Sequence, residues 1–172
     1  SCRCIITINN GLKKFFVQNG VDVDSIVVAH DGVSISDFNI GNESKHSLRQ
    51  SLGIPSDRKI FAYIGKYKTM SKDKGIDFLI RVFPEIKKKY PESFLLLVGI
   101  NQSEIHNVRG IFGQVMMKEE DYKIVLHVPH NRIISYLLSS DIMVMNYPNI
   151  EHYAQYMSPL KMFEYMASGN II

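Results

Sequence analysis

Short apolar runs alternate along this chain with stretches whose apolar residues recur at helical spacing. Residues 60–64 and 94–99 are nearly continuous apolar runs, as expected for strands that are covered on both faces. Between them, residues 76–86 carry apolar side chains along one side of a helix. Strands that alternate with helices over short loops predict an α/β protein with a doubly wound parallel sheet.

The same patterns predict the position of each element. Strands are expected at residues 5–8, 26–29, 60–64, 94–99, 124–127 and 142–145, with one more beginning at Ile171. Helices are expected at 12–18, at 45–52, after 74, within 101–122, after Pro129 and from Ser158. Loops are expected at 66–73 and 146–157. Pro84 is expected to kink its helix or to shift its end.

Two of these loops are expected to meet at one end of the sheet. Doubly wound sheets bind ligands beyond the carboxyl ends of the strands, where the strand order reverses. In a core of four strands that begins at Ile60, the first and fourth strands flank this point. The loop after the first strand runs from Gly65 to Asp73, and the loop after the fourth leads into Ser158. Both segments are therefore expected beside one crevice.

The segment from Ser158 to Gly169 is the most informative part of the chain. Serine is a good N-cap, and Pro159 would then occupy the first helical position. The unpaired N–H groups and positive dipole end of such a helix suit a phosphate. Glu164 borders the apolar stripe that includes Leu160, so its carboxylate needs a hydrogen-bond partner. The segment thus offers an anion site and a carboxylate that can bind hydroxyl groups.

Composition narrows the class of protein. The chain has 172 residues, of which 45% are hydrophobic and 22% charged, as is ordinary for a globular protein. A net charge of +3 is too small to indicate nucleic-acid binding. Cys2 and Cys4 are expected to be reduced, and no apolar run approaches membrane-spanning length. We expect a cytoplasmic protein, with association at a membrane surface left open.

Several segments together resemble the nucleotide-sugar-binding domain of GT-B glycosyltransferases, in the retaining group called family 4. The similar segments are 26–33 with Phe38, 62–66 with 74–79, 128–142, and above all 158–169. The resemblance implies a Rossmann-like donor domain at residues 41–172, truncated at its C-terminal end. Residues 1–40 would be the remnant of an N-terminal acceptor domain and the linker, so the chain is expected to be a fragment that transfers no sugar alone.

The resemblance also assigns roles to residues around the donor diphosphate. Lys66 and Lys74 stand where the family binds the diphosphate, and they would stabilise the leaving group during catalysis. Gly65 would allow close approach of the backbone. The backbone N–H groups near Ser158, Pro159, Leu160 and Lys161 would hold the distal phosphate. No metal and no cofactor are expected.

Other roles concern the nucleoside and the sugar. Glu164 matches the second glutamate of the family's E-x7-E motif and would bind the ribose hydroxyls. Tyr156 stands at the position of the first glutamate, so contact with the donor sugar must differ there. The base is expected near His127 and Val128. The acceptor, which could be a carbohydrate, a lipid or a small molecule, is not disclosed.

Each assignment has a simpler alternative. The lysines Lys66 and Lys74 could be solvated, and Glu164 could be a surface carboxylate paired with a lysine. Lys161 could be a third phosphate partner or, equally, a solvated or helix-capping lysine, and His127 could be an ordinary strand-end histidine. At the level of the whole protein, a non-catalytic nucleotide-sugar-binding module and a nucleotide-sugar epimerase on the same fold remain open.

Overall fold

The computed structural model describes residues 4–41, 43–69 and 72–172, so Cys2 lies outside the described residues. The strands are β1 (Ile5–Thr7), β2 (Ile26–Val28), β3 (Lys59–Ile64), β4 (Lys68–Thr69), β5 (Lys72–Asp73), β6 (Ser93–Ile100), β7 (Tyr122–Leu126) and β8 (Ile142–Met143). The α-helices are α1 (Asn10–Gln18), α2 (Lys45–Leu52), α3 (Ile76–Lys89), α4 (Ile105–Gln114), α5 (His130–Ser139) and α6 (Leu160–Ala167). Shorter turns are η1 (Val23–Ser25), η2 (Ile35–Phe38), η3 (Glu119–Asp121) and the π-helical η4 (His152–Tyr156). None of the helices in these ranges is both long and apolar enough to cross a bilayer.

The main sheet has four parallel strands in the order β7-β6-β3-β8. In chain order this is third, second, first and fourth, so the strand order reverses between β3 and β8, as predicted. Ile171 forms an isolated parallel bridge with Ile142, where the sequence predicts the start of a further strand. The prediction of a doubly wound α/β sheet is therefore confirmed.

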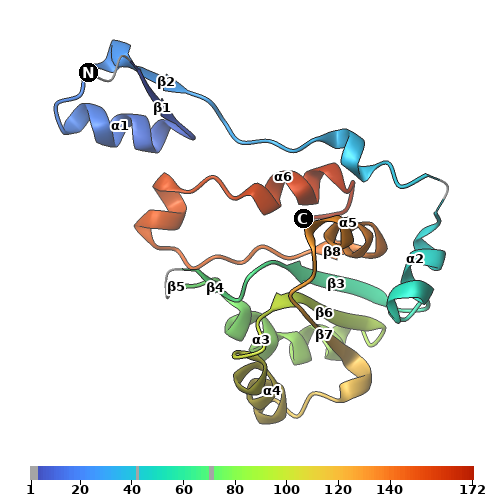
Figure 1. The fold of residues 1–172 in the computed structure, drawn as a ribbon. Coiled ribbons are helices and arrows are strands. Elements are labelled where there is room, and N and C mark those ends of the chain that lie inside the picture. The colour runs from blue at the N-terminus through green and yellow to red at the C-terminus, as the bar shows by residue number, and fades with distance from the viewer. Residues whose placement is uncertain (1–3, 42, 70–71) are drawn as a thin grey trace.

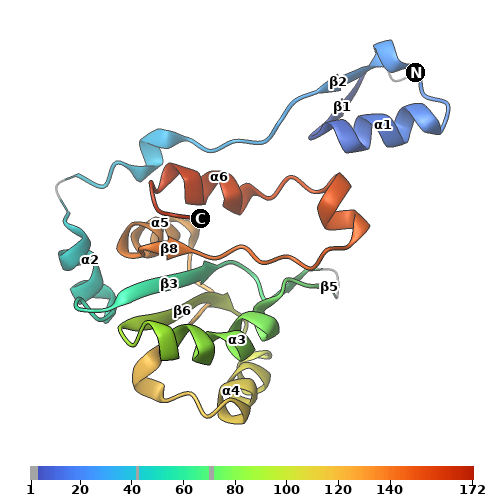
Figure 2. The same cartoon turned by 180° about the vertical axis from the view of Figure 1, so that it is seen from behind.

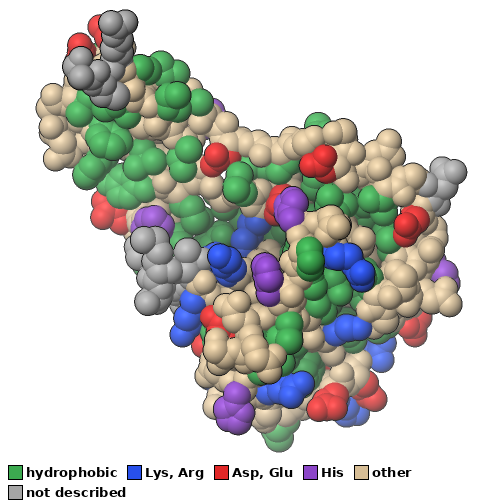
Figure 3. All heavy atoms as spheres, in the orientation of Figure 1, with side chains coloured by type: hydrophobic (Ala, Val, Ile, Leu, Met, Phe, Trp, Pro, Cys, Tyr) green, Lys and Arg blue, Asp and Glu red, His purple; other side chains and the backbone are tan. Residues whose placement is uncertain are grey.

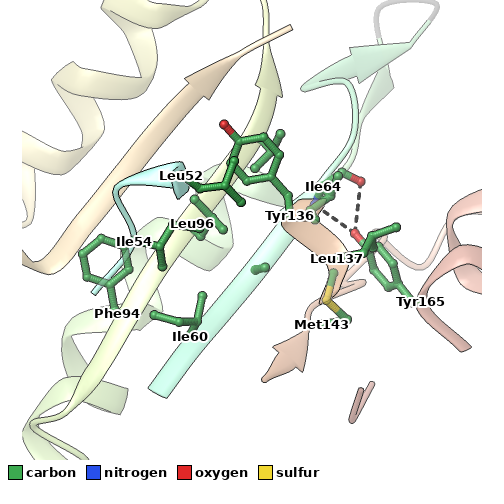
Figure 4. Close-up of a cluster of buried hydrophobic side chains, with 12 residues drawn as sticks. Leu52, Ile54, Ile60, Ile64, Phe94, Leu96, Tyr136, Leu137, Met143 and Tyr165 are labelled. Carbon is green, nitrogen blue, oxygen red and sulfur yellow. Dashed lines mark hydrogen bonds between the residues drawn. The ribbon is translucent and has the colours of Figure 1, made fainter. Parts of the chain in front are cut away.

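Helices cover both faces of this sheet (Figures 1 and 2). On one face, α3 and α4 pack onto the side chains of β6 that point towards them. On the other face, α2, α5 and α6 enclose a second cluster, which Figure 4 shows in detail. All eight residues of β6 are buried, which explains its continuous apolar sequence.

The N-terminal residues form a separate small unit. β1 and β2 pair in parallel through α1, and an extended segment joins them to the main body (Figure 1). In Figure 3, hydrophobic side chains gather on this unit, and Ile6 is 71% exposed. The unit touches the main body where α1 meets η4, since a Cβ atom at Gly11 would lie 1.9 Å from the carbonyl oxygen of Gln155. Glycine is therefore required at this contact.

Pro84 lies within α3, which runs from Ile76 to Lys89, so the helix does not end at this proline. Three local predictions were wrong. The expected loop 66–73 contains the antiparallel β4–β5 pair, and the expected loop 146–157 contains η4. The last helix begins at Leu160 with Pro159 at its N-cap, and Ser158 makes no capping hydrogen bond. The expected serine cap is thus replaced by a proline whose extended backbone directs the chain into the helix.

Asp141 links the sheet to α2. Its carboxylate lies 2.6 Å from the Arg49 guanidinium and 3.3 Å from the Lys45 ammonium, and it accepts a hydrogen bond from the Ile60 N–H. Burial alone would raise the pKa of Asp141, but the Ile60 N–H and Arg49, with the charge of Lys45, lower it below its ordinary value. Asp141 therefore has a structural role, joining the start of β3 to α2.

Replacing Asp141 with asparagine is expected to lower the free energy of unfolding by about 1.5 kcal/mol at neutral pH, because hydrogen bonds to a charged group are lost. The folded pKa lies below the unfolded value, so the stabilisation is present above about pH 4 and is lost as the pH falls through the folded pKa. Urea unfolding of both proteins at pH 7 and near pH 3 measures this. An equal difference at both pH values would contradict the assignment.

Candidate functional site

The end of β3 and the start of α6 lie against each other. Gly65 follows β3 with a φ angle of +147°, and a Cβ atom there would lie 2.8 Å from the Nζ atom of Lys161. Gly99, at the neighbouring strand β6, is equally constrained, because its Cβ would lie 2.9 Å from the Gly65 carbonyl oxygen. The two glycines let the backbone and a lysine side chain pack at van der Waals distance where the sequence predicts a crevice.

Lys66 and Lys74 bracket the β4–β5 pair after β3. Lys66 is exposed, whereas Lys74 is partly buried and immediately precedes the Gly75 N-cap of α3. Burial lowers the pKa of Lys74, and the neighbouring charge of Lys66 lowers it further. Two ammonium groups that repel each other across a loop form a favourable place for an anion.

Lys161 is buried in the first turn of α6. Its Nζ atom donates to the hydroxyl of Tyr63 at 2.7 Å, and it lies 4.0 Å from the centre of that ring and 5.2 Å from that of Tyr147. Burial lowers the pKa of Lys161 to about 7, with a further contribution from Lys74 and an opposing one from Glu164. The alternative of a solvated lysine is therefore wrong, and Lys161 joins the cluster of cations.

Tyr165 holds α6 in this position. Its fully buried hydroxyl accepts a hydrogen bond from the Ile64 N–H at 2.9 Å and donates one to the Ile64 carbonyl at 3.1 Å (Figure 4). These bonds join the last residue of β3 to the middle of α6. The N–H groups at the start of α6, including those of Leu160 and Lys161, have no acceptor within the helix and remain available to a ligand. Pro159 has no N–H to contribute.

Glu164, one turn after Leu160 on α6, lies at a cavity of about 190 Å³. The cavity is lined by Gly32, Val33, Ser34, Asp37, Phe38, His130, Ile134, Leu160 and Glu164. The carboxylate is 19% exposed, and one of its oxygens lies 3.8 Å from Nδ1 of His130. The structure thus places the His130 ring beside this carboxylate. A largely buried carboxylate at a cavity can accept hydrogen bonds from hydroxyl groups.

The remaining predicted residues lie elsewhere. Tyr156 points towards the N-terminal unit, since its ring contacts that of Phe15 edge-on at 5.8 Å and its hydroxyl donates to Glu151. His127 is exposed just beyond β7, and the partly buried Val128 packs against the core cluster between the sheet and α2, α5 and α6. Neither of these two is among the described residues that line the Glu164 cavity.

Sequence reasoning did not identify Tyr63, Tyr165 and His130 as parts of this site. Tyr63 and Tyr165 read as ordinary core residues, because their apolar rings fit the strand and helix patterns. Their buried hydroxyls need partners, and this requirement is the only signal that could have drawn attention to them. Within residues 4–41, 43–69 and 72–172, no group of three His, Cys, Asp or Glu residues is placed to hold a metal ion.

Solved structures share this fold. The Anabaena protein HepE, in complex with UDP, aligns with 98% of this chain and 43% of its own, at 16% identity and a TM-score of 0.76. A glycosyltransferase from Rickettsia africae aligns over the same shares at 20% identity, with a TM-score of 0.73. The chain thus has the Rossmann-like architecture of GT-B glycosyltransferases and spans less than half of these proteins.

Sequence comparison agrees with this assignment. An uncharacterized glycosyltransferase from Methanocaldococcus jannaschii is 29% identical over 93 residues, which are 52% of this chain and 23% of that protein. The family profile described as glycosyl transferases group 1 matches residues 44–172, from the start of α2 to the end of the sequence. With a match over most of its length, this chain belongs to the group 1 glycosyltransferases.

Proposed function

We propose that this chain is the donor-binding part of a retaining glycosyltransferase and that it binds a nucleotide-diphosphate sugar. The observation that carries the proposal is the meeting of three lysines with a helix N-terminus at the point where the strand order reverses. Lys66 and Lys74 approach from the loop after β3, and Lys161 and its N–H group from α6. Neighbouring ammonium groups beside a helix N-terminus match the negative charge of a diphosphate.

The chemistry follows from the charge of the leaving group. When the bond between the sugar and the diphosphate breaks, the nucleoside diphosphate carries additional negative charge. Cations and oriented N–H groups that face the diphosphate stabilise this charge more in the transition state than in the bound donor. Lys66, Lys74 and the start of α6 would therefore serve as the catalytic groups of the donor domain, and the reaction would need no metal ion.

The nucleoside is proposed to lie along α6 towards Glu164. The carboxylate would accept hydrogen bonds from the ribose hydroxyls, and the adjacent cavity would accommodate part of the nucleoside. HepE was solved with UDP and also with UDP-glucose, which supports a nucleoside diphosphate as the ligand class. The base is proposed to lie near His127 and Val128, after β7.

The domain division is also proposed. Residues 41–172 would form the donor domain, and residues 1–40 would belong to the acceptor domain and the linker. Tyr156 contacts Phe15, which would then belong to the acceptor domain. The glutamate expected at position 156 would instead contact the donor sugar. Because a tyrosine replaces that glutamate, a non-catalytic nucleotide-sugar-binding protein is the second candidate.

Calorimetric titration of the 172-residue chain with UDP, GDP and ADP tests donor binding. We expect one of the three to bind at a single site, and failure of all three would contradict the proposal. A longer version that includes a complete acceptor side, incubated with labelled donor, then separates the two candidates. Transfer of the label to an acceptor identifies a transferase, and binding without transfer identifies a binding protein.

A further inference from the structure

The buried ammonium of Lys161 is connected to the backbone of Lys66 by a chain of two hydrogen bonds. Lys161 donates to the Tyr63 hydroxyl at 2.7 Å, and that hydroxyl donates to the Lys66 carbonyl at 3.1 Å. Because an ammonium can only donate, the Tyr63 hydroxyl must accept from Lys161, and its own proton is then free to point at the Lys66 carbonyl. The same Nζ atom also lies where a side chain at Gly65 would be. It therefore supports both residues of the turn that follows β3.

We propose that Lys161 is a positioning residue of the donor site, which holds the Gly65–Lys66 backbone through the Tyr63 hydroxyl so that Lys66 faces the diphosphate. The inference rests on the proposed function and deepens it. It assigns to Lys161 an action through Lys66, in place of direct contact between its side chain and the phosphate. The 9% exposure of Lys161 and its hydrogen bond to Tyr63 favour this action, because they hold the ammonium against the turn that follows β3, where little of it faces solvent.

The charge of Lys161 determines the direction of this chain of hydrogen bonds. The ammonium faces Tyr63 from β3, Tyr147 from the segment after β8, Lys74 from before α3, and Glu164 on α6 itself. Burial and Lys74 lower the pKa of Lys161 to about 7. When Lys161 is a neutral amine, it can accept a hydrogen bond from the Tyr63 hydroxyl. That hydroxyl would then no longer donate to the Lys66 carbonyl. A bound diphosphate favours the charged form, so donor affinity should fall as the pH rises through 7.

The test measures donor affinity in single and double variants of the 172-residue chain. The probes are UDP-glucose, GDP-mannose and ADP-glucose, whose esterified diphosphates do not titrate near neutrality, and the tightest binder is used throughout. Lys161→Met, Tyr63→Phe and Lys66→Ala are each expected to weaken binding about tenfold, since each breaks the same charge-assisted contact. The double variants are expected to bind no more weakly than Lys66→Ala alone, because the three residues act as one unit.

The pH profile gives a readout that a merely structural lysine would not change. The original chain is expected to lose about tenfold in affinity between pH 6 and pH 8, whereas Lys161→Met should show no such loss. Lys88→Ala, at the far end of α3, removes the same charge and serves as the control that should retain both affinity and pH profile. Tyr63→Phe leaves Lys161 in place, so it tests the chain of hydrogen bonds even if Lys161→Met does not fold.

The outcomes distinguish this inference from the proposed function. If no probe binds the original chain, both fail. If a probe binds but Lys161→Met or Tyr63→Phe still weakens binding tenfold in the Lys66→Ala background, the action does not pass through Lys66 and the inference is overturned. A probe that binds with the same affinity to Tyr63→Phe as to the original chain also overturns it, while leaving the proposed function intact.

Discussion

Replacing Lys74 with alanine is expected to weaken the binding of UDP by the 172-residue chain about a hundredfold, the upper end of what a hydrogen bond to a charged group contributes. Lys74 is partly buried, and its charge is already opposed by burial and by Lys66. A partly buried ammonium is screened less by solvent than an exposed one, so its contact with a diphosphate is worth more. Isothermal titration of the variant measures the loss directly.

The control for Lys74 is again Lys88→Ala, because Lys88 forms an exposed pair with Glu85 at the other end of the same helix. Exposed pairs contribute little, so this variant should bind UDP as the original chain does. Uridine, which has no phosphate, should bind both variants equally. An equal loss of UDP and uridine affinity in Lys74→Ala would show that Lys74 does not act on the diphosphate.

Replacing Glu164 with glutamine is expected to weaken UDP binding about fiftyfold, because two hydroxyl groups lose a charged acceptor. The carboxylate is largely buried beside His130 and lines the cavity under the segment 32–38. The loss should be absent when 2′,3′-dideoxy-UDP replaces UDP, since that ligand lacks the groups that Glu164 would bind. Titration of both ligands into both proteins completes a double-mutant cycle.

Glu85→Gln is the matched control for Glu164, because it makes the same change on the exposed face of α3. It should alter neither ligand's affinity. If Glu164→Gln weakens UDP and the dideoxy ligand to the same extent, the carboxylate does not contact the ribose. Glu164 would then act only through its contacts with neighbouring side chains, such as His130 and Lys161.

The sequence predicts the sheet well, because the apolar runs are long and the connections short. With right-handed crossovers and helices on both faces, four strands from Ile60 onwards have few arrangements available, and the observed order follows. The approach of the Gly65 loop to the start of α6 is a direct consequence of that order.

Other parts of the site depend on contacts that are distant in the sequence. The sequence leaves Lys161 open between a phosphate partner, a solvated lysine and a helix cap, because its burial depends on Tyr63, which lies 98 residues earlier. The β4–β5 strands have two residues each, too few for a periodic pattern. The proximity of His130 to Glu164 depends on how α5 and α6 lie side by side on one face of the sheet, which no local pattern specifies.

The most direct test of the account is to map the amide chemical-shift changes that UDP causes in the 19.7 kDa chain. The account predicts that the largest changes occur at the end of β3, at Gly65 and Lys66, and at the start of α6, at Leu160 and Lys161. Changes confined to the opposite end of the sheet, around Lys59 and Ser93, would contradict the proposal that a diphosphate binds between β3 and α6. A spectrum unchanged by saturating UDP, GDP and ADP would contradict it as well.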